Sequence, residues 1–318
     1  MDELIVHEWP EAESPTLVVG LTGWMDGGHV STGALGWLRE RLEATRFAEI
    51  DPMDFYLFNF PVSSIPISIF LEGDRAVVAP INPMEFAAVF RPHTHIRGGV
   101  VEDLVYPAND FWVAPAGESG EAPPVVMFTG EEPHIRWGSW CDCIFGVCAE
   151  LDIRDVFFVG SVASPVPHTR EPRIRASVSD PALKQRLVDA GLGFGDYEGP
   201  SSIITALTYH AADVNLAWHN LVVEVPHYPF LDMPTYPHSI LTVAAALNRL
   251  VGLDLDLSDL EQAAAVARGK LDALAAENDE FRQLVTKLEQ AYDQAISQDD
   301  EELLRRLIDT VDLEGMSE

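Results

Sequence analysis

Four short runs of almost uninterrupted apolar residues are the feature that most limits how this chain can fold. They read TLVVGL (16–21), PVVMFTG (124–130), DVFFVG (155–160) and LVVEVP (221–226). Strands this apolar are usually covered on both faces, as in parallel sheets flanked by helices. A glycine-rich turn follows the first run, and the apolar residues of the next stretch, 29–42, recur at helical spacing. The sequence therefore predicts an α/β fold.

Further elements follow from the same periodicities. The expected strands are 54–60, 75–80, 98–107, 110–115 and 173–179. The expected helices are 135–151, 182–191, 201–214 and 238–252. Residues 61–114 contain several prolines, so we expect an irregular region with strands that has the character of an insertion.

The composition changes after residue 253, so we divide the chain into a core domain, 1–253, and an acidic helical extension, 254–318. In the extension, Ser258 and Glu261 have the spacing of a capping box at a helix start. A second helix carries an apolar stripe, and a third is expected at 301–311. The stripe consists of Phe281, Leu284, Val285, Leu288, Tyr292 and Ile296. Because these helices have few apolar residues, we expect them to pack on the core or on another subunit.

Charge limits the partners. The chain has 318 residues and a formal net charge of −31, so it repels nucleic acid and anionic membranes, and we expect neither as a partner. No segment approaches the roughly 18 uninterrupted apolar residues of a membrane helix. The acidic N-terminal residues lack the basic flank of a signal peptide. Since nothing suggests a disulfide scaffold either, we predict a cytoplasmic protein.

The three cysteines, Cys141, Cys143 and Cys148, lie together in WCDCIFGVC. Their spacing matches no standard zinc motif, and no fourth ligand lies nearby. The stretch has the pattern of a buried helix, in which free thiols pack as small apolar groups. We therefore predict structural thiols rather than a metal site or a disulfide framework.

Two loops at predicted strand ends could carry chemistry. GLTGWMDGGH (20–29) joins a strand to a helix, as phosphate-binding loops do, but it lacks both the Walker and the dinucleotide glycine spacing. Asp26 could instead cap the helix. In EEPHIRW (131–137), Glu132 could be a general base or could favour a helix N-terminus electrostatically. For both loops the structural role is the favoured interpretation.

Two further strand ends carry a Val-Pro-His sequence. VPHTREPR (166–173) contains His168, Thr169 and Arg170. Arg170 with the Thr169 hydroxyl could form an anion site, or Arg170 could equally pair with an acidic neighbour. VPHYPF (225–230) contains His227 and Tyr228. His168 and His227 could bind a metal with His93 or His95, although hydrogen-bonded corners beside proline are the favoured interpretation. No nucleophile stands in a recognisable motif.

Taken in order, these loops resemble the successive motifs of the proteasome assembly chaperone 2 family, in particular its bacterial branch of stand-alone proteins. The motifs are GWMDGG (23–28), EPHIRW (132–137), VPHTREPR (166–173), YEGPSS (197–202) and VPHYPFLDMP (225–234). The resemblance runs from about residue 15 to about residue 252, and the acidic tail with LEQAYD (288–293) is similar to that branch as well.

The resemblance implies a three-layer α/β fold of the phosphorylase/hydrolase-like type, with a mixed sheet flanked by helices. It also implies a homo-oligomer, with a trimer favoured, and a role in assisting the assembly of other proteins. The family's eukaryotic and archaeal members act on the proteasome, and the client of the bacterial branch is unknown. We expect neither a cofactor nor a metal.

The candidate pocket is placed at the edge of the sheet where the parallel strands end, since ligands of open α/β sheets bind there. Its residues are Gly23, Trp24, Asp26, Gly27, Glu132, Trp137, His168, Thr169, Arg170, Gly199, Pro200, His227 and Tyr228. The chain departs from the family at Ser201-Ser202, where Thr-Gly is usual, and in DLEGMSE, which differs from the tail by which some archaeal relatives dock.

Three hypotheses about function remain open. The first is a non-enzymatic assembly or interaction factor. The second is a phosphorylase- or hydrolase-like enzyme for a small anionic or nucleoside-like substrate, which requires Asp26, Glu132, His168, Arg170 and His227 to come together. The third is that residues 278–297 form an arm that grips a partner, which requires the apolar stripe to be free.

Overall fold

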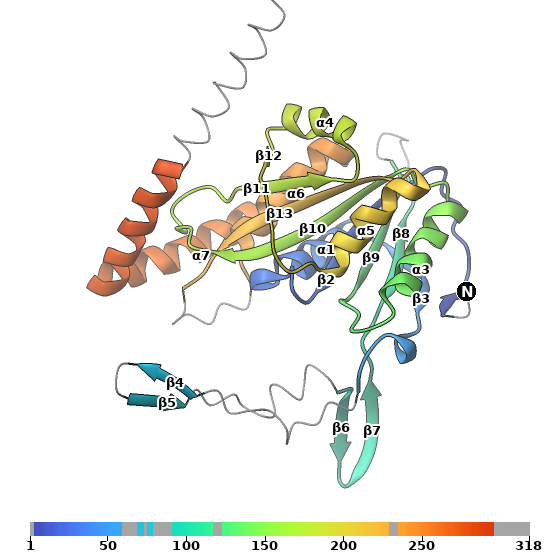
Figure 1. Ribbon diagram of the computed structural model, residues 1–318, viewed down its shortest axis with the longest axis horizontal. Coiled ribbons are helices and arrows are strands. Elements are labelled where there is room, and N and C mark those ends of the chain that lie inside the picture. The colour runs from blue at the N-terminus through green and yellow to red at the C-terminus, as the bar shows by residue number, and fades with distance from the viewer. Residues whose placement is uncertain are drawn as a thin grey trace, which may run out of the picture.

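The computed structural model describes residues 3–58, 69–72, 75–78, 91–116, 123–228 and 235–295. Within them, a nine-stranded mixed sheet runs through the molecule (Figure 1). In sheet order its strands are β1 (Leu4–Val6), β3 (Thr45–Ile50), β8 (Asp110–Ala114), β9 (Val125–Glu131), β2 (Thr16–Thr22), β10 (Asp155–Ser164), β13 (Ala217–Pro226), β11 (Ile174–Val178) and β12 (Gly193–Phe194).

The four apolar runs form the centre of the sheet. Strands β9, β2, β10 and β13 are neighbours and all run parallel. This confirms the prediction of a parallel core. Strands β10 and β13 are longer than predicted, because their pairing continues from Asp155 opposite Ala217 as far as Ser164 opposite Pro226. Since parallel strands end at one edge, the loops that follow these four strands share that edge of the sheet.

Helices cover both faces of the sheet, which confirms the expected layered α/β arrangement (Figure 1). On one face lie α1 (Val30–Arg41), α4 (Lys184–Asp189), α6 (Pro237–Val251) and α7 (Ser258–Glu277). On the other face lie α3 (Trp137–Glu150) and α5 (Ile203–Ala211). Successive residues of a strand point to opposite faces, so Val18 belongs to the first core and its neighbours Leu17 and Val19 belong to the second.

The strand predicted over 54–60 is wrong. Residues Pro52–Asp54 form a 3-10 turn, η2, in which the Asp51 carboxylate accepts the N–H of Met53 at 2.9 Å. A proline and a capping aspartate favour this turn over an extended strand, and the apolar Phe55 is buried after it. Residues 59 and 60 lie outside the described residues. Strands β1 and β3 were not expected from the sequence.

The region 61–114 contains the three strands expected there. Residues 75–80 and 98–107 contain β5 (Arg75–Val78) and β7 (Val100–Val105), which pair with β4 (Ile69–Glu72) and β6 (His93–Arg97), respectively. The third, β8, belongs to the main sheet. The β6–β7 hairpin extends away from the main sheet (Figure 1), and all its side chains are exposed.

Helix α7 begins at Ser258, but the capping box predicted with Glu261 does not form. The Asp256 carboxylate instead accepts both the N–H and the O–H of Ser258, each at 3.0 Å. The N–H and O–H donors of Ser258 are thus satisfied by a carboxylate two residues earlier, and not through a capping box. The remaining expected helices, 182–191, 201–214 and 238–252, match the regions that contain α4, α5 and α6.

A second helix of the extension covers residues 279–295 and packs on this chain's own core. Phe281, Val285 and Tyr292 are buried, and Leu284 and Leu288 lie against the cluster of α1 and α6. The described part of the stripe is therefore not free, and the hypothesis of a helical arm that grips a partner is wrong for these residues. Ile296 and the helix expected at 301–311 lie outside the described residues. Among the described helices, none combines the length and apolar character needed to cross a bilayer.

Candidate functional site

The loop after β2 is held by Asp26, as the structural interpretation predicted. The carboxylate accepts the N–H of Thr32 at 3.1 Å and its O–H at 2.8 Å, and His29 Nδ1 lies 3.6 Å away. Burial raises the pKa of Asp26. Gly27 lies so close to β10 that a Cβ there would come within 2.8 Å of the Ala163 nitrogen. This loop is therefore built for close packing.

Glu132 joins three segments at the edge where the parallel strands end. One carboxylate oxygen accepts the N–H of Trp24 at 3.1 Å, and the other accepts the N–H of Ile203, the first residue of α5, at 3.0 Å. A negative charge at a helix N-terminus is stabilising. Gly23 has φ of 126°, and a Cβ there would lie 2.8 Å from the Glu132 Cβ. Glu132 thus fixes the loop that presents the Trp24 side chain.

His168 and Tyr228, from the two Val-Pro-His segments, meet after β10 and β13. The Tyr228 hydroxyl accepts the backbone N–H of His168 at 2.9 Å and lies 2.7 Å from its Nδ1. Nε2 lies 3.3 Å from Asp272 of α7. Since the hydroxyl can donate to Nδ1, this pattern fits a neutral ring that carries its proton on Nε2. The ring of Phe281 stacks on His168 at 5.9 Å.

Thr169 and Arg170 bind the helix at 279–295. Thr169 donates to Glu289 at 2.6 Å. Arg170 donates two hydrogen bonds of 2.8 Å to the carboxylate of Asp293 and one of 3.0 Å to Glu289. Arg170 thus pairs with acidic residues of the chain itself, which was the expected alternative to an anion site. Paired N–H groups of arginine match a carboxylate in geometry.

The remaining predicted residues lie at the margins. Trp137 is the first residue of α3, and its indole N–H donates to the Pro133 carbonyl at 2.9 Å. Gly199 and Pro200 are exposed in the loop before α5. His227 is exposed, and its backbone N–H donates to Ser164 at 3.2 Å.

The predicted residues thus form two groups. One contains Gly23, Trp24, Asp26, Gly27 and Glu132 around the loop after β2. The other contains His168, Thr169, Arg170 and Tyr228 beneath the extension. Among the interactions described, none joins two of the five side chains required by the enzyme hypothesis. Of these five side chains, His227 is exposed, and each of the other four binds a separate partner. This is not the arrangement of an acid–base set.

The histidines of the metal alternative are also divided. His93 and His95 lie in β6, outside the main sheet, whereas His168 and His227 follow β10 and β13. In the described ranges no three His, Cys, Asp or Glu side chains gather as metal ligands. The sequence pattern alone could not place the hairpin away from the sheet edge.

Sequence reasoning did not assign the partners in the extension, Asp272, Glu289 and Asp293. A signal for two of them was present, because Glu289 and Asp293 are four residues apart and so share one face of a helix. That face also adjoins Tyr292, whose hydroxyl donates to the Glu171 carbonyl at 2.5 Å.

A model of the PAC2 family matches residues 20–275 of the chain. The chain belongs to the PAC2 family. The resemblance seen in the ordered loop motifs is thereby confirmed, and the match continues beyond residue 252 into α7. Among curated proteins, no significant match was found.

Solved structures support the same fold. A PAC2 family protein from Streptomyces avermitilis is similar at 24% identity and a TM-score of 0.66, over 85% of this chain and 99% of that one. A Mycobacterium tuberculosis protein of unknown function has 21% identity and a TM-score of 0.74, over 94% and 91%. A proteasome-assembly chaperone homologue from Mycobacterium tuberculosis has 22% identity and a TM-score of 0.68, over 85% and 99%.

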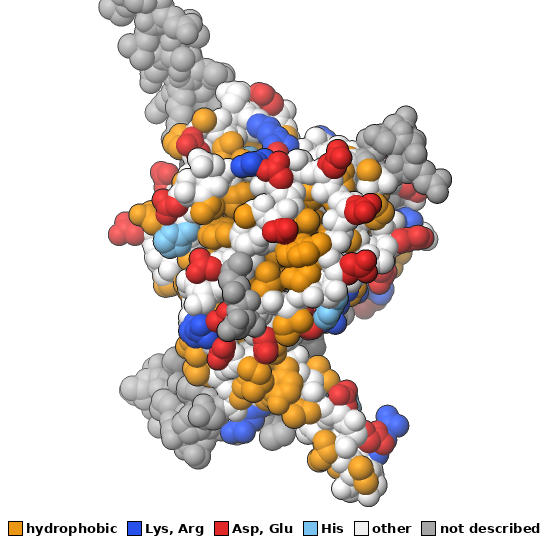
Figure 2. Space-filling view, turned by 90° about the vertical axis from the view of Figure 1, so that its right-hand side faces the viewer, with side chains coloured by type: hydrophobic (Ala, Val, Ile, Leu, Met, Phe, Trp, Pro, Cys, Tyr) orange, Lys and Arg blue, Asp and Glu red, His pale blue; other side chains and the backbone are white. Residues whose placement is uncertain are grey.

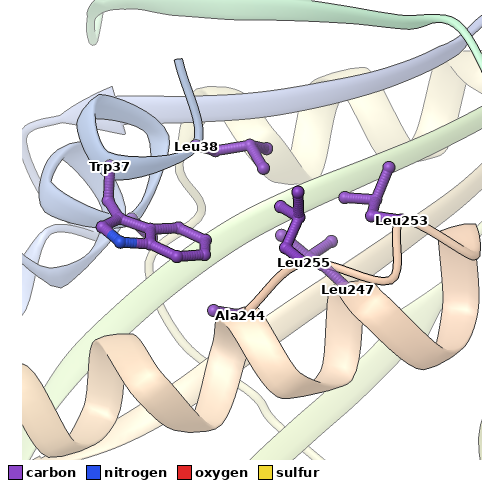
Figure 3. A pocket seen from close by; sticks show the side chains of 7 residues that line it. Trp37, Leu38, Ala244, Leu247, Leu253 and Leu255 are labelled. Carbon is purple, nitrogen blue, oxygen red and sulfur yellow. The ribbon is translucent and has the colours of Figure 1, made fainter. Parts of the chain in front are cut away.

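Two hollows in the described part of this PAC2 family chain lie away from the predicted residues. An apolar cavity of about 10 Å³ lies between α1 and α6, and it is too small for any ligand larger than a water molecule (Figure 3). Its lining is Ala34, Trp37, Leu38, Ala244, Leu247, Leu253 and Leu255. An open groove lies between residues 10–14 and 150–152.

The three cysteines are buried free thiols in α3, as predicted. Burial raises the pKa of Cys141 to about 12 and that of Cys143 to about 11. Since the thiolate is the reactive form, these residues are poor nucleophiles near neutral pH.

His168 should make the stability of the protein depend on pH. Burial lowers its pKa, and Asp272 opposes that shift only in part. The unfolded chain therefore binds a proton more tightly than the folded one. The contribution of His168 is complete above the unfolded pKa of about 6.5 and is lost as the pH falls through the folded pKa.

We expect His168→Gln to lose less unfolding free energy than the wild type between pH 7 and pH 5, as measured by urea denaturation. His227→Gln, a change at an exposed histidine, serves as the control and should follow the wild-type profile. Parallel profiles for His168→Gln and the wild type would contradict the assigned role of burial.

Proposed function

We propose that this chain is a non-enzymatic factor that assists the assembly or interaction of other proteins. The observation that carries the proposal is the engagement of Thr169 and Arg170 by Glu289 and Asp293. The strand-end site that would receive a small anion in the enzyme hypothesis is thus filled by this chain's own extension. The fold shared with a proteasome-assembly chaperone homologue and with an archaeal proteasome activator from Pyrococcus furiosus adds support.

The surface proposed to contact the client is the exposed part of the candidate site, with Trp24 at its centre. Trp24 is 66% exposed, and Glu132 holds its backbone in place. Tyr197, in the loop before α5, is also exposed. Large aromatic side chains held on a rigid backbone are typical of residues that dominate binding between proteins. The class of client proposed is therefore a folded protein subunit with an apolar pocket.

The test is a tagged pull-down from lysate of the source organism at low and high salt, because salt weakens contacts driven only by charge. We expect one protein in stoichiometric amount at both salt concentrations. Trp24→Ala should reduce its recovery at least about tenfold, which corresponds to roughly 1.4 kcal/mol.

Tyr209→Ala is the matched control, since Tyr209 is also a well-exposed aromatic residue, on α5, with 75% exposure. It should leave recovery unchanged. Recovery of the bait alone, together with turnover of a nucleoside or phosphate ester by the purified chain, would overturn the proposal and favour the enzyme.

We further propose that the protein is a cytoplasmic homo-oligomer, with a trimer favoured. The free thiols of α3 support a reducing compartment. Light scattering during size-exclusion chromatography measures the oligomeric state directly.

A further inference from the structure

The β6–β7 hairpin exposes apolar side chains on a structure that is too small to be stable by itself. Ile96, Val101 and Leu104 are 59%, 62% and 48% exposed. Ile96 pairs with Val101, and Thr94 pairs with Leu104, so these side chains share one face of the hairpin. Two-stranded hairpins in water are at best marginally stable. The apolar face therefore needs a partner.

This surface continues onto the body of the protein. Tyr106, directly after β7, lies 5.4 Å from Phe58, and Met53 and Leu57 are exposed nearby in the chain. Figure 2 shows hydrophobic side chains gathered on the protruding segment at the bottom and where it joins the body. Contiguous exposed apolar surface of this kind marks sites of protein association.

The hairpin also has two open edges of opposite charge. Within the described residues, β6 and β7 pair only with each other. Strand β6 carries His93, His95 and Arg97, and β7 carries Glu102 and Asp103. An open strand edge is a template for another strand. An edge with positive charge and an edge with negative charge fit each other across two copies.

We propose that the occupant of this surface is a second copy of this chain, with β6 of one copy pairing antiparallel to β7 of the next. Two arginines, Arg91 and Arg97, balance Glu102 and Asp103, so the segment 91–106 has no net charge in a chain whose total is −31. Copies of this acidic protein therefore meet less repulsion at the hairpin than the charge of the whole chain would give.

The charge pattern also selects the kind of contact. A symmetric contact of β6 with β6 would place cations together, and one of β7 with β7 would place carboxylates together. The contact of β6 with β7 is head-to-tail, and repeating it around a rotation axis closes a ring. This inference rests on the homo-oligomer proposed above and names the surface that forms it.

The test uses two charge reversals at the tip, Arg97→Glu and Glu102→Arg, in the full chain. Arg97→Glu alone presents two acidic edges, and Glu102→Arg alone removes the net negative charge of β7. We therefore expect the self-association of each variant to weaken, roughly tenfold or more for Arg97→Glu, as measured by light scattering across a concentration series. An equimolar mixture of the two should regain part of the lost assembly, because opposite charges meet wherever the two variants alternate, while a ring of three copies keeps one contact between like variants. Each variant also breaks the ion pair of 3.3 Å between Arg97 and Glu102 inside its own hairpin. Mixing could not restore that pair.

Arg154→Glu is the matched control, since Arg154 is an exposed arginine paired with Asp152 and the change in charge is identical. It should assemble as the wild type does. A wild type that is monomeric at every concentration overturns both the homo-oligomer and this surface. If both variants assemble unchanged, or if mixing restores none of the lost assembly, the hairpin surface is overturned and the homo-oligomer is not. Client capture in the pull-down is measured separately and decides the assembly role.

Discussion

Replacing Phe281 with alanine should release the second helix of the extension. Phe281 is 1% exposed and packs against both His168 and Tyr228, at ring distances of 5.9 and 4.9 Å. Truncation of a fully buried phenylalanine costs about 3–5 kcal/mol. Hydrogen exchange should therefore show loss of protection at residues 279–295 by about that free energy, while the central strands keep theirs.

A second readout comes from His168. Once the Phe281 ring no longer shields it, water reaches the imidazole, so its pKa should rise toward the ordinary value for histidine. Gln283→Ala, at an exposed position of the same helix, is the matched control and should change neither measurement. Unchanged exchange at residues 279–295 in Phe281→Ala would mean that Arg170 and its two carboxylates hold the helix without the apolar contact.

Replacing Gly27 with alanine should destabilise the core domain. The added Cβ would lie 2.8 Å from the nitrogen of Ala163 and 3.0 Å from the carbonyl carbon of Val162. Both atoms belong to the backbone of β10, which is fixed by its pairing with β13, so the loop must move instead. Overpacking of this kind costs about 1–3 kcal/mol, and urea denaturation at pH 7 measures the loss.

Gly36→Ala provides a control that should change the unfolding free energy in the opposite direction. Gly36 lies within α1, and a Cβ there would meet no atom within 4 Å. In a helix interior, alanine is more stable than glycine by roughly 0.5–1 kcal/mol. Gly27→Ala should thus lower the unfolding free energy and Gly36→Ala should raise it. A stabilised Gly27→Ala would show that the loop after β2 can move without loss of stability.

The elements predicted best are those whose sequence pattern reflects burial alone. The runs at 16–21, 124–130, 155–160 and 221–226 are apolar because helices cover both faces of the sheet, and that pattern needs no knowledge of distant residues. The helices at 29–42 and 135–151 follow in the same way from helical spacing. The strand wrongly expected at 54–60 has a similar composition, but local capping by Asp51 decided the turn.

The candidate site was predicted only in part, because its side chains act through residues far away in the sequence. Their positions at one edge of the sheet follow from the ends of the parallel strands. The partners of these side chains cannot be read from the strand ends. Glu132 binds the start of α5, 71 residues later, and Arg170 binds Asp293, 123 residues later. No local pattern encodes such contacts.

The sequence by itself thus determined the α/β class, the parallel centre of the sheet, the edge that carries the loops and the family, since each depends on local periodicity or on motifs in order. Only the tertiary structure decided that the extension packs on its own core, that its carboxylates occupy the site of Thr169 and Arg170, and that the β6–β7 hairpin stands apart from the sheet. Those outcomes depend on which of many acidic and apolar side chains come together in space, and that choice is made by packing of the whole chain.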